Sequence, residues 1–256
     1  MSKAIIISMF VSLITGIFGN SGTPTKSPEE TGNVEGALTS VQNENQLTLE
    51  YKTGDLGVVW AFIEDPSKLS LHLNLEDKKT AASANTELGC KLLVNGGFYS
   101  KEDKPIGLFV ASGKTISNWQ ENRLFNGILG ITKEGKVQII GSRGDFENAV
   151  QTGPVLVKDG VHKELAIKND TPARRVVAGI TIEGKLVFLS FFNPASYYLG
   201  PNLEDLPFLL KSFEKQTGIE IKDAINLDGG TASAFYAEGI SLTELRPIGS
   251  YFCSKD

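Results

Sequence analysis

The sequence predicts an α+β fold: a β-rich domain of mixed and antiparallel sheet with one long helix and a few short helices. From residue 41 onward, strand-length segments that alternate with period two or form short apolar runs dominate the chain. Four glycine-containing turns separate apolar segments, as tight hairpins require. One segment, Leu203–Thr217, has the length and apolar spacing of a well-formed helix.

Composition narrows the class of protein. Of 256 residues, 41% are hydrophobic and 21% charged, which is typical of a globular chain that buries a core. The net charge of -5 leaves no basic excess to neutralise phosphates, so we expect no nucleic-acid partner. The chain has two histidines, His72 and His162, and two cysteines, Cys90 and Cys253. These counts exclude a Cys-rich zinc module.

The N-terminus has the pattern of an export signal. Lys3 precedes the uncharged, mostly apolar segment Ala4–Phe18, and small and polar residues follow at once. Residues 1–21 are therefore predicted to be a signal peptide or, if uncleaved, a membrane anchor, although a bilayer span needs roughly 20 apolar residues. Residues 22–40 are rich in polar residues, glycine and proline, and are predicted to be a disordered linker. The globular domain is predicted to span residues 41–256.

Export would place Cys90 and Cys253 in an oxidising compartment, where a disulfide between them is allowed. Such a bond would contribute about 3–5 kcal/mol in the chain-entropy model. Two buried free thiols are the alternative, and the sequence leaves the two open.

The first half of the domain reads mainly as strands. The predicted strands are Leu47–Tyr51, Val58–Ile63, Leu69–Leu75 and Lys91–Asn95. Thr80–Leu88 is predicted to be a short helix that ends at Gly89. The hairpin turns that follow are Ser112-Gly113, Glu134-Gly135, Asp159-Gly160 and Glu183-Gly184, where glycine supplies the positive φ that other residues resist.

The predicted long helix, Leu203–Thr217, has signals at both ends. Asn202 is expected to cap its N-terminus and Gly218 to end it. Its apolar residues lie on one face at helical spacing, which favours core packing over a ligand stripe. The next strand, Ala224–Leu227, runs directly into Asp228.

Two Gly-Gly turns mark the predicted site. They lie in the segments Asn95-Gly96-Gly97-Phe98 and Asn226-Leu227-Asp228-Gly229-Gly230-Thr231. In each, a polar residue ends an apolar strand and paired glycines follow. Glycine lets the backbone approach a ligand and turn its N–H groups toward an anion. The alternative is that both are ordinary turns.

Two further segments support an anion site. Thr152-Gly153-Pro154 opens the apolar run Val155–Val157. Arg174 and Arg175 precede the apolar run Val176–Gly179, so Arg175 is placed to clamp a phosphate or carboxylate with two hydrogen bonds. A solvated charge at a strand edge is the alternative for this arginine.

The order of these segments, from Lys91 to Ser254, resembles the phosphodiester glycosidase family. The segments that carry the resemblance are Asn95–Tyr99, Lys104–Gly107, Thr152–Gly160, Arg175 with Gly179, and Ala224–Gly230. The chain departs from the family pattern at three places. Thr231-Ala232-Ser233 stands where the family usually has a glycine and two serines, Val176 follows Arg175 where threonine is usual, and Asn193-Pro194 stands where Asp-Gly-Arg is frequent.

The resemblance implies hydrolysis between the anomeric carbon of a sugar and a phosphodiester. Asp228 and Arg175 are the expected catalytic residues: the carboxylate to activate water or support the oxocarbenium-like sugar, the guanidinium to stabilise charge on phosphate oxygens. The backbone N–H groups of both Gly-Gly turns are expected to assist Arg175. The second carboxylate is open among Asp103, Asp145, Glu147 and Glu238, and so is the choice between retention and inversion.

The expected substrate-binding residues lie on the same turns and strand ends. They are Asn95, Gly96, Gly97, Phe98, Thr152, Gly153, Asn226, Gly229, Gly230, Thr231 and Ser233. Phe98 and Tyr99 are read either as a sugar-stacking platform or as core, and Thr231 and Ser233 either as sugar ligands or as partners of the backbone. His162 is expected to be an exposed hairpin residue.

Two functions follow from this site. The first is a secreted or envelope hydrolase that acts on a glycosyl phosphodiester in envelope or extracellular polysaccharide. The second is a non-catalytic module that binds anionic or phosphorylated glycan. Neither requires a cofactor, although Asp228 and Asn226 offer oxygen ligands for Ca²⁺. The expected partner is a phosphorylated carbohydrate, and membrane contact is expected only through an uncleaved N-terminal segment.

Overall fold

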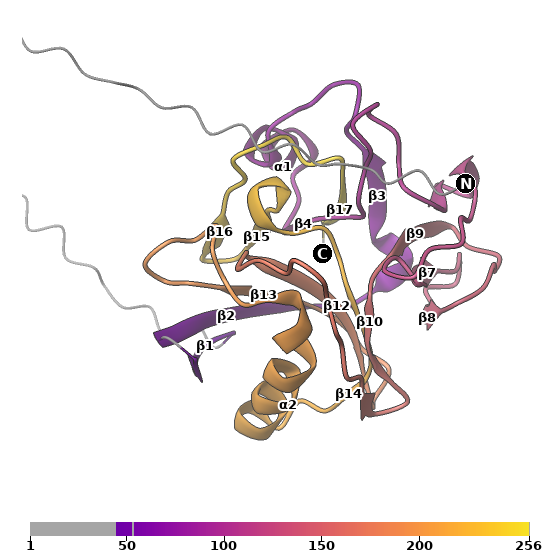
Figure 1. Cartoon of the computed structure of the whole chain (residues 1–256). Helices are drawn as coiled ribbons and strands as arrows, with labels where there is room; N and C mark the ends of the chain where they lie inside the picture. The colour runs from indigo at the N-terminus through magenta and orange to yellow at the C-terminus, as the bar shows by residue number, and fades with distance from the viewer. Residues whose placement is uncertain (1–44, 53, 256) are drawn as a thin grey trace, which may run out of the picture. The chain divides into compact units, whose positions relative to one another are not determined.

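The computed structural model describes residues 45–52 and 54–255, all of which belong to the unit Gln42–Asp256 (Figure 1). The predicted signal or anchor, residues 1–21, and the predicted linker, residues 22–40, lie outside the described residues. Those two interpretations, and the domain boundary at residue 41, therefore stay predictions. No helix in the described part of the chain is both long enough and apolar enough to span a bilayer.

The described residues form a β-rich fold of three sheets, in which the registered strand pairs are antiparallel (Figure 1). The predicted α+β class is confirmed. The strands are β1 (Gln46–Tyr51), β2 (Gly54–Ile63), β3 (Ser70–Leu73), β4 (Leu92–Asn95), β5 (Phe109–Ala111), β6 (Lys114–Ser117), β7 (Gly127–Ile131), β8 (Val137–Ile140), β9 (Asn148–Thr152), β10 (Val155–Lys158), β11 (Val161–His162), β12 (Arg175–Thr181), β13 (Leu186–Phe192), β14 (Ile221–Asn226), β15 (Phe235–Ala237), β16 (Ile240–Leu242) and β17 (Ser250–Ser254). The α-helices are α1 (Ala81–Leu88) and α2 (Leu206–Thr217), and the 3₁₀ turns are η1 (Pro66–Lys68), η2 (Leu203–Asp205) and η3 (Gly230–Ala232).

The seven-stranded sheet, in the order β1-β2-β13-β12-β14-β10-β11, has a different partner on each face. Val177 and Leu189 pack with Leu209 and Phe213 of α2 on one face. This confirms the predicted apolar face of the long helix. Because α2 connects β13 to β14 and β12 lies between them, the helix is the crossover of the sheet.

The opposite face of this sheet contributes to the central core. There Val176 and Phe188 join Val94 and Phe252 of the second sheet, β16-β15-β4-β17-β3, and Leu129 of the third, β6-β5-β9-β7-β8. Consecutive residues of β12 thus lie in different cores, as the alternation of a strand requires. Arg175 is the first residue of this strand, and Arg174 immediately precedes it.

Both glycines predicted to end helices do so, whereas the predicted cap of the long helix is not observed. Thr80 Oγ1 accepts the Ser83 N–H at 3.1 Å and begins α1, while Gly89 and Gly218, at φ of 67° and 74°, end the two helices. The predicted Asn202 cap is wrong, since its side chain makes no capping bond and the first turn is 3₁₀. Asp170 takes that role, because its Oδ2 accepts the Glu204 N–H at 2.9 Å.

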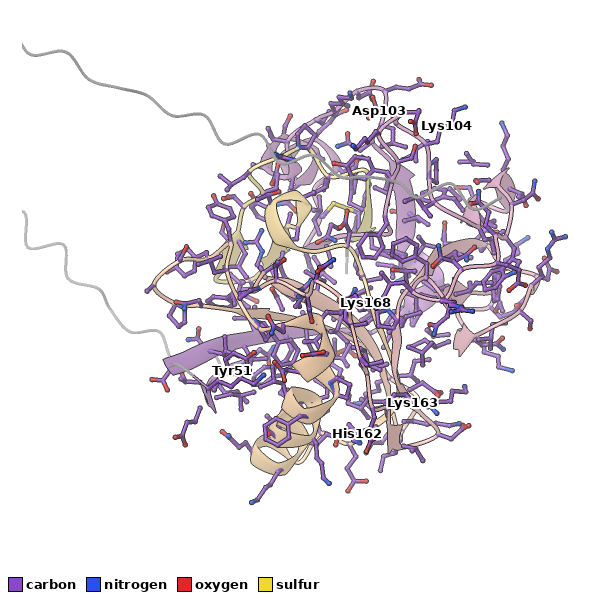
Figure 2. All side chains as sticks on the ribbon, in the orientation of Figure 1. Tyr51, Asp103, Lys104, His162, Lys163 and Lys168 are labelled. Carbon is purple, nitrogen blue, oxygen red and sulfur yellow. A yellow bond between two sulfur atoms is a disulfide. The ribbon has the colours of Figure 1, made fainter. Side chains whose placement is uncertain are left out.

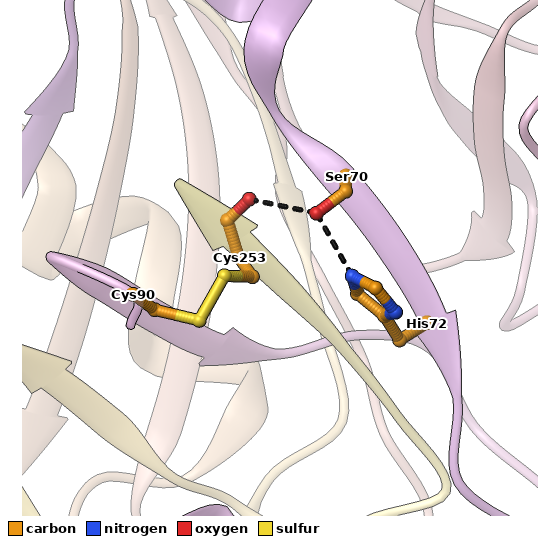
Figure 3. Close-up of a disulfide and its surroundings, with 4 residues drawn as sticks. All are labelled: Ser70, His72, Cys90 and Cys253. Carbon is orange, nitrogen blue, oxygen red and sulfur yellow. Dashed lines mark hydrogen bonds between the residues drawn. A yellow bond between two sulfur atoms is a disulfide. The ribbon is translucent and has the colours of Figure 1, made fainter. Parts of the chain in front are cut away.

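A disulfide joins Cys90, two residues before β4, to Cys253 of β17 (Figure 3). The structure thereby decides between the disulfide and the two free thiols. Ser70 of the edge strand β3 donates its hydroxyl to the carbonyl of Cys253 at 3.1 Å, and its Oγ lies 2.8 Å from Nε2 of His72. The C-terminal strand is therefore fixed on both sides.

Candidate active site

The structure brings the two Gly-Gly turns together, although they follow strands of different sheets. The Asp228 N–H donates to the Gly96 carbonyl at 3.1 Å. The Asn95 side chain donates to the Asp228 carbonyl at 2.8 Å and accepts the Ala234 N–H at 3.0 Å. Asn95 is buried, and its side chain therefore holds the second turn against the end of β4.

The third predicted segment, between β9 and β10, joins the same place. Thr152 donates its hydroxyl to the Asn226 carbonyl at 2.7 Å, and the Asn226 amide donates to the Gly153 carbonyl at 2.9 Å. Both side chains are buried and committed to the backbone. Asn226 Oδ1 is also buried, with no hydrogen-bond partner among the described residues.

Asp228 is the carboxylate at these turns, and its pKa is shifted far from the ordinary value. The residue retains partial exposure, yet burial of its carboxyl raises the pKa to about 7. The bond that Oδ1 accepts from the Gly229 N–H, 2.8 Å long, and the charge of Arg175 oppose this shift only in part. A carboxyl with such a pKa exchanges protons near neutral pH, which is the property required of a general acid or base.

Arg175 is held rigidly at the start of β12. Its Nε donates to the Pro201 carbonyl at 3.1 Å, and its Nη2 donates to the Thr171 carbonyl at 2.6 Å and to Asp170 Oδ1 at 3.0 Å. No acceptor among the described residues is bonded to its Nη1. Burial lowers the Arg175 pKa from its usual value, an effect that Asp170 and Asp228 oppose. The guanidinium is thus anchored by one edge while its charge reaches Asp228.

Arg174 lies on the opposite side of the strand and is fully buried. It donates from Nε to the Ser233 hydroxyl at 2.8 Å, and from Nη2 to the carbonyls of Ser233 and Thr243. Burial lowers its pKa to about 10, and the Tyr198 ring centroid lies 5.5 Å from its Cζ. The Arg174 carbonyl accepts the Gly230 N–H at 2.7 Å. Side chain and backbone of Arg174 therefore support the turn that carries Asp228.

The glycine N–H groups differ from the prediction. The Gly96 N–H donates to the Ser250 carbonyl at 2.8 Å, the Gly229 N–H to Asp228, and the Gly230 N–H to Arg174. Three of the four amides are thus engaged within the protein. The expectation that both turns direct their N–H groups at an anion is corrected accordingly, because the turns use those donors to hold their own shape.

Ser233 and Thr231 occupy different environments. Ser233 is fully buried; its hydroxyl accepts from Arg174 and donates to the Gly230 carbonyl at 2.7 Å. These contacts place it in the support of the turn. Thr231 is exposed, and its carbonyl accepts the N–H groups of Leu245 and Arg246 at 2.8 and 2.9 Å.

The two aromatic residues after Gly97 are half-buried. Phe98 stacks on Phe125 with ring centroids 4.4 Å apart. Tyr99 donates its hydroxyl to the Pro247 carbonyl at 2.8 Å, and burial, followed by the charge of Asp228, raises its pKa. The negative charge of Asp228 therefore disfavours ionisation of the Tyr99 hydroxyl.

Asp103 and His162 each have an ion-pair partner of their own. Asp103 is paired with Lys78 at 2.7 Å, though its charge also acts on Tyr99. His162 faces Glu214 of α2 at 3.1 Å, and Figure 2 shows it on the side of the molecule opposite Asp103. None of the predicted second carboxylates contributes to the pKa shift of Asp228. In the described part of the chain, no three His, Cys, Asp or Glu side chains are grouped to hold a metal ion.

Sequence reasoning missed the supporting residues: Arg174, Asp170 and Tyr198. The one available signal was the doubled arginine at the start of a buried strand, since alternation places two such neighbours on opposite faces. Asp170 and Tyr198 lie in loops with no pattern that marks them.

Comparisons with known proteins identify the family of this chain. The phosphodiester glycosidase family model matches residues 88–253, a range that includes all three strand ends. The chain therefore belongs to the phosphodiester glycosidase family, as the resemblance predicted. A search of curated proteins found no match.

Solved structures share the fold at low sequence identity. One is the catalytic domain of zebrafish N-acetylglucosamine-1-phosphodiester alpha-N-acetylglucosaminidase, auto-inhibited by its pro-peptide; the TM-score is 0.64 at 17% identity, over 82% of this chain and 81% of that one. Another is a hypothetical protein from Synechocystis, with a TM-score of 0.58 at 12% identity, over 81% of this chain and 61% of that one. At these identities the likeness concerns the fold alone.

Proposed function

We propose that this chain is an exported hydrolase that cleaves a sugar-1-phosphodiester bond in envelope or extracellular glycan. The observation that carries the proposal is the Asp228 carboxyl, whose pKa burial raises to about 7 beside the anchored guanidinium of Arg175. Membership of the phosphodiester glycosidase family supports the bond type. The name of the zebrafish enzyme describes that same class of bond.

The proposed reaction uses both residues. Ionised Asp228 takes a proton from water as the water oxygen attacks the anomeric carbon, and the bond from that carbon to the phosphate oxygen breaks. The leaving group is a phosphate monoester, whose second pKa of about 6 lets it depart without a strong general acid. Arg175 stabilises the charge that develops on the phosphate oxygens. No step is assigned to a metal ion, and we expect turnover to survive a chelator.

Substitution of Asp228 tests this function. In Asp228→Asn, we expect kcat on a chromogenic sugar-1-phosphodiester to fall by at least about a hundredfold, as for loss of a general base. Its melting temperature at pH 8 should rise, because the folded protein no longer holds a desolvated negative charge. Asp159→Asn is the matched control, since Asp159 also precedes a glycine but lies in the exposed β10–β11 turn. Near-normal turnover by folded Asp228→Asn would refute the assignment.

A non-catalytic module that binds anionic glycan is the second candidate. One observation favours it: Asp228 has no partner carboxylate among the groups that shift its pKa, whereas most glycosidases use a pair. Saturable binding of the same phosphodiester by the wild-type protein, without product, would establish this candidate in place of the hydrolase.

The proposed export has its own test. Support comes from Lys3 and the Ala4–Phe18 segment, and from a disulfide of the kind that persists in oxidising compartments. N-terminal sequencing of protein from the envelope or medium should find a start near Ser21 or Gly22. An intact Met1 in a soluble cytoplasmic pool would end this proposal, and a full leader retained in membranes would favour the anchor.

A further inference from the structure

A pocket of about 570 Å³ lies outside the candidate active site, between strands of two sheets. Its size is within the range of small-molecule sites. Its lining residues come from β1 and β2, the end of β13, the loop that follows β13, and the β15–β16 hairpin. The lining residues are Gln46, Leu47, Thr48, Gly57, Val58, Val59, Phe192, Pro194, Tyr197, Gly239, Ile240, Ser241 and Leu242.

Strand register places this pocket at the same end of the seven-stranded sheet as Asp228. Asn226 of β14 pairs with Val177 of β12. Two residues nearer the start of β12, Arg175 pairs with Phe191 of β13, and Phe191 in turn pairs with Val58 of β2. The pocket therefore begins about two strand spacings from Asp228 and extends to about four, roughly 10–19 Å across the sheet. A glycosyl chain of a few units spans such a distance.

The loop after β13 connects the pocket to the candidate active site. Tyr197 lines the pocket, and the next residue, Tyr198, covers the Arg174 guanidinium. The same loop supplies the Pro201 carbonyl that holds Arg175. One loop thus lines the pocket and also contacts both arginines.

The lining is uncharged. None of its thirteen residues is Lys, Arg, Asp or Glu, although 21% of the chain is charged. A phosphate would find no cation there, so the pocket does not suit a second anionic group. It combines apolar side chains with nearly as much polar surface, to which Gln46, Thr48 and Ser241 contribute, and a neutral ligand with both hydroxyl groups and C–H faces suits such a lining.

An aromatic ring is presented at the mouth of the pocket. Tyr197 is 55% exposed, and its ring lies edge-on to Phe192 with the centroids 5.6 Å apart. A half-exposed ring braced by a second ring offers a flat apolar surface with a polar tip. Such a surface matches the C–H face of a sugar, while the amide and hydroxyls nearby match its hydroxyl groups.

We infer that this pocket is a binding site for an uncharged part of a glycan, with Tyr197 as its stacking platform. The inference rests on the proposed function, in that the bound glycan carries the phosphodiester presented to Asp228. The pocket would hold the polymer two or more strand spacings from the cleaved bond. It would thereby favour long substrates over short ones.

Titration calorimetry with neutral oligosaccharides tests the inference without any turnover. The probes are maltohexaose, cellohexaose, chitohexaose and mannohexaose, each added to wild-type protein, Tyr197→Ala and Tyr197→Phe. We expect at least one probe to bind the wild type, Tyr197→Ala to weaken that binding about tenfold, and Tyr197→Phe to retain most of it. Phe208→Ala is the control, because Phe208 is 67% exposed on α2, the helix that covers the other face of the sheet. Thermal unfolding verifies that each variant is folded.

The possible results separate this inference from the proposed function. Failure of all four probes to bind, or equal binding by Tyr197→Ala, would overturn the pocket assignment even if the chromogenic phosphodiester is hydrolysed. Binding of dodecylphosphocholine with the same dependence on Tyr197, in place of the oligosaccharides, would assign the pocket to an apolar chain and overturn it too. If oligosaccharide binding depends on Tyr197 but the chromogenic phosphodiester is not hydrolysed, the result would support the pocket and refute the hydrolase.

Discussion

Asp228 combines partial access to solvent with a desolvated carboxyl. Its backbone is fixed on both sides, by the bond from its N–H to Gly96 and by the bond from Asn95 to its carbonyl. Within residues 45–52 and 54–255, the one hydrogen bond that the carboxyl accepts comes from the Gly229 N–H. A rigid backbone with a weakly solvated side chain keeps the pKa high without letting the group move to solvent.

The pH dependence of catalysis follows from this pKa of about 7. A general base must be ionised, so kcat/KM should rise about tenfold per pH unit below 7 and level off above it. A phosphodiester lacks the second ionisation that a phosphate monoester has near pH 6, so ionisation of the substrate does not change kcat/KM in this pH range. A pH profile from 5 to 9 checks this. A flat profile, or one that falls through pH 7, would show that ionised Asp228 is not the base.

The two adjacent arginines should respond differently to the same substitution. Arg175→Lys should lower kcat at least about tenfold. Lysine cannot replace a planar guanidinium whose Nε and Nη2 are held by the protein while its charge stabilises the phosphate. Loss of the bonds to Asp170 and Pro201 will also lower its stability, so activity is measured per folded protein.

Arg174→Lys is the matched comparison. It leaves the buried carbonyls of Ser233 and Thr243 without their donor, which should lower the free energy of unfolding by roughly 2–4 kcal/mol. Urea unfolding and kcat on both variants decide the matter. Full activity in Arg175→Lys, combined with loss in folded Arg174→Lys, would mean that Arg174 is the functional arginine.

At the scale of the element, the β14–η3 turn depends on two glycines for different reasons. A Cβ on Gly229 would lie 2.7 Å from the Arg174 carbonyl oxygen, a backbone atom that cannot yield. A Cβ on Gly230 would make only an ordinary contact, 3.6 Å from the Ala173 Cβ, but the residue has a φ of +64°. The first position is therefore limited by a close approach of two backbones, the second by conformation.

These limits predict unequal effects of alanine. Gly229→Ala should displace the turn and reduce both stability and kcat, because the clash moves Asp228 itself. Gly230→Ala should cost about 1–2 kcal/mol with kcat nearly kept, and Gly230→Asn less, since asparagine accepts left-handed geometry. Thermal unfolding and kcat on the three variants check this order. Equal tolerance at both positions would show that the turn is not held against β12 as described.

The elements that were predictable from the sequence are those with local signals. Thr80 and Gly89 bound α1, and Gly113, Gly135, Gly160 and Gly184 mark their hairpins through chemistry within a few residues. The Asn202 cap failed because Asp170, more than thirty residues earlier, takes that role. A tertiary contact of that kind leaves no trace in the local pattern.

The site was predictable as a set of segments but not as an arrangement. Asn95 and Asp228 are 133 residues apart, and nothing local says that their turns share hydrogen bonds. The same limit applies to Arg174, whose burial depends on Ser233 and Thr243. It also explains the glycine amides: their commitment to Ser250 and Arg174 appears only once the sheets are packed.

At the scale of the whole domain, the three sheets meet in one core, and the site lies where strands from all three end. β4 belongs to the second sheet, β9 to the third and β14 to the seven-stranded sheet. Their ends are joined mainly by hydrogen bonds between side chains and backbone. The geometry of the site therefore depends on these bonds between strand ends, whereas the disulfide restrains the other end of β4.

Removal of the disulfide should separate stability from catalysis. Cys90 precedes the first residue of β4, whereas Asn95 ends that strand, so the covalent link and the site lie at opposite ends of it. The double variant Cys90→Ala/Cys253→Ala should lose about 3–5 kcal/mol of unfolding free energy, because the closed loop of 163 residues no longer restricts the unfolded chain. Register with β17, which pairs Tyr251 with Asn95, should still hold the strand end in the folded protein. Denaturant unfolding and kcat below the transition test both parts, with reduced wild-type protein as the comparison. A large loss of kcat at unchanged stability would show that the disulfide positions the site directly, contrary to its place in the fold.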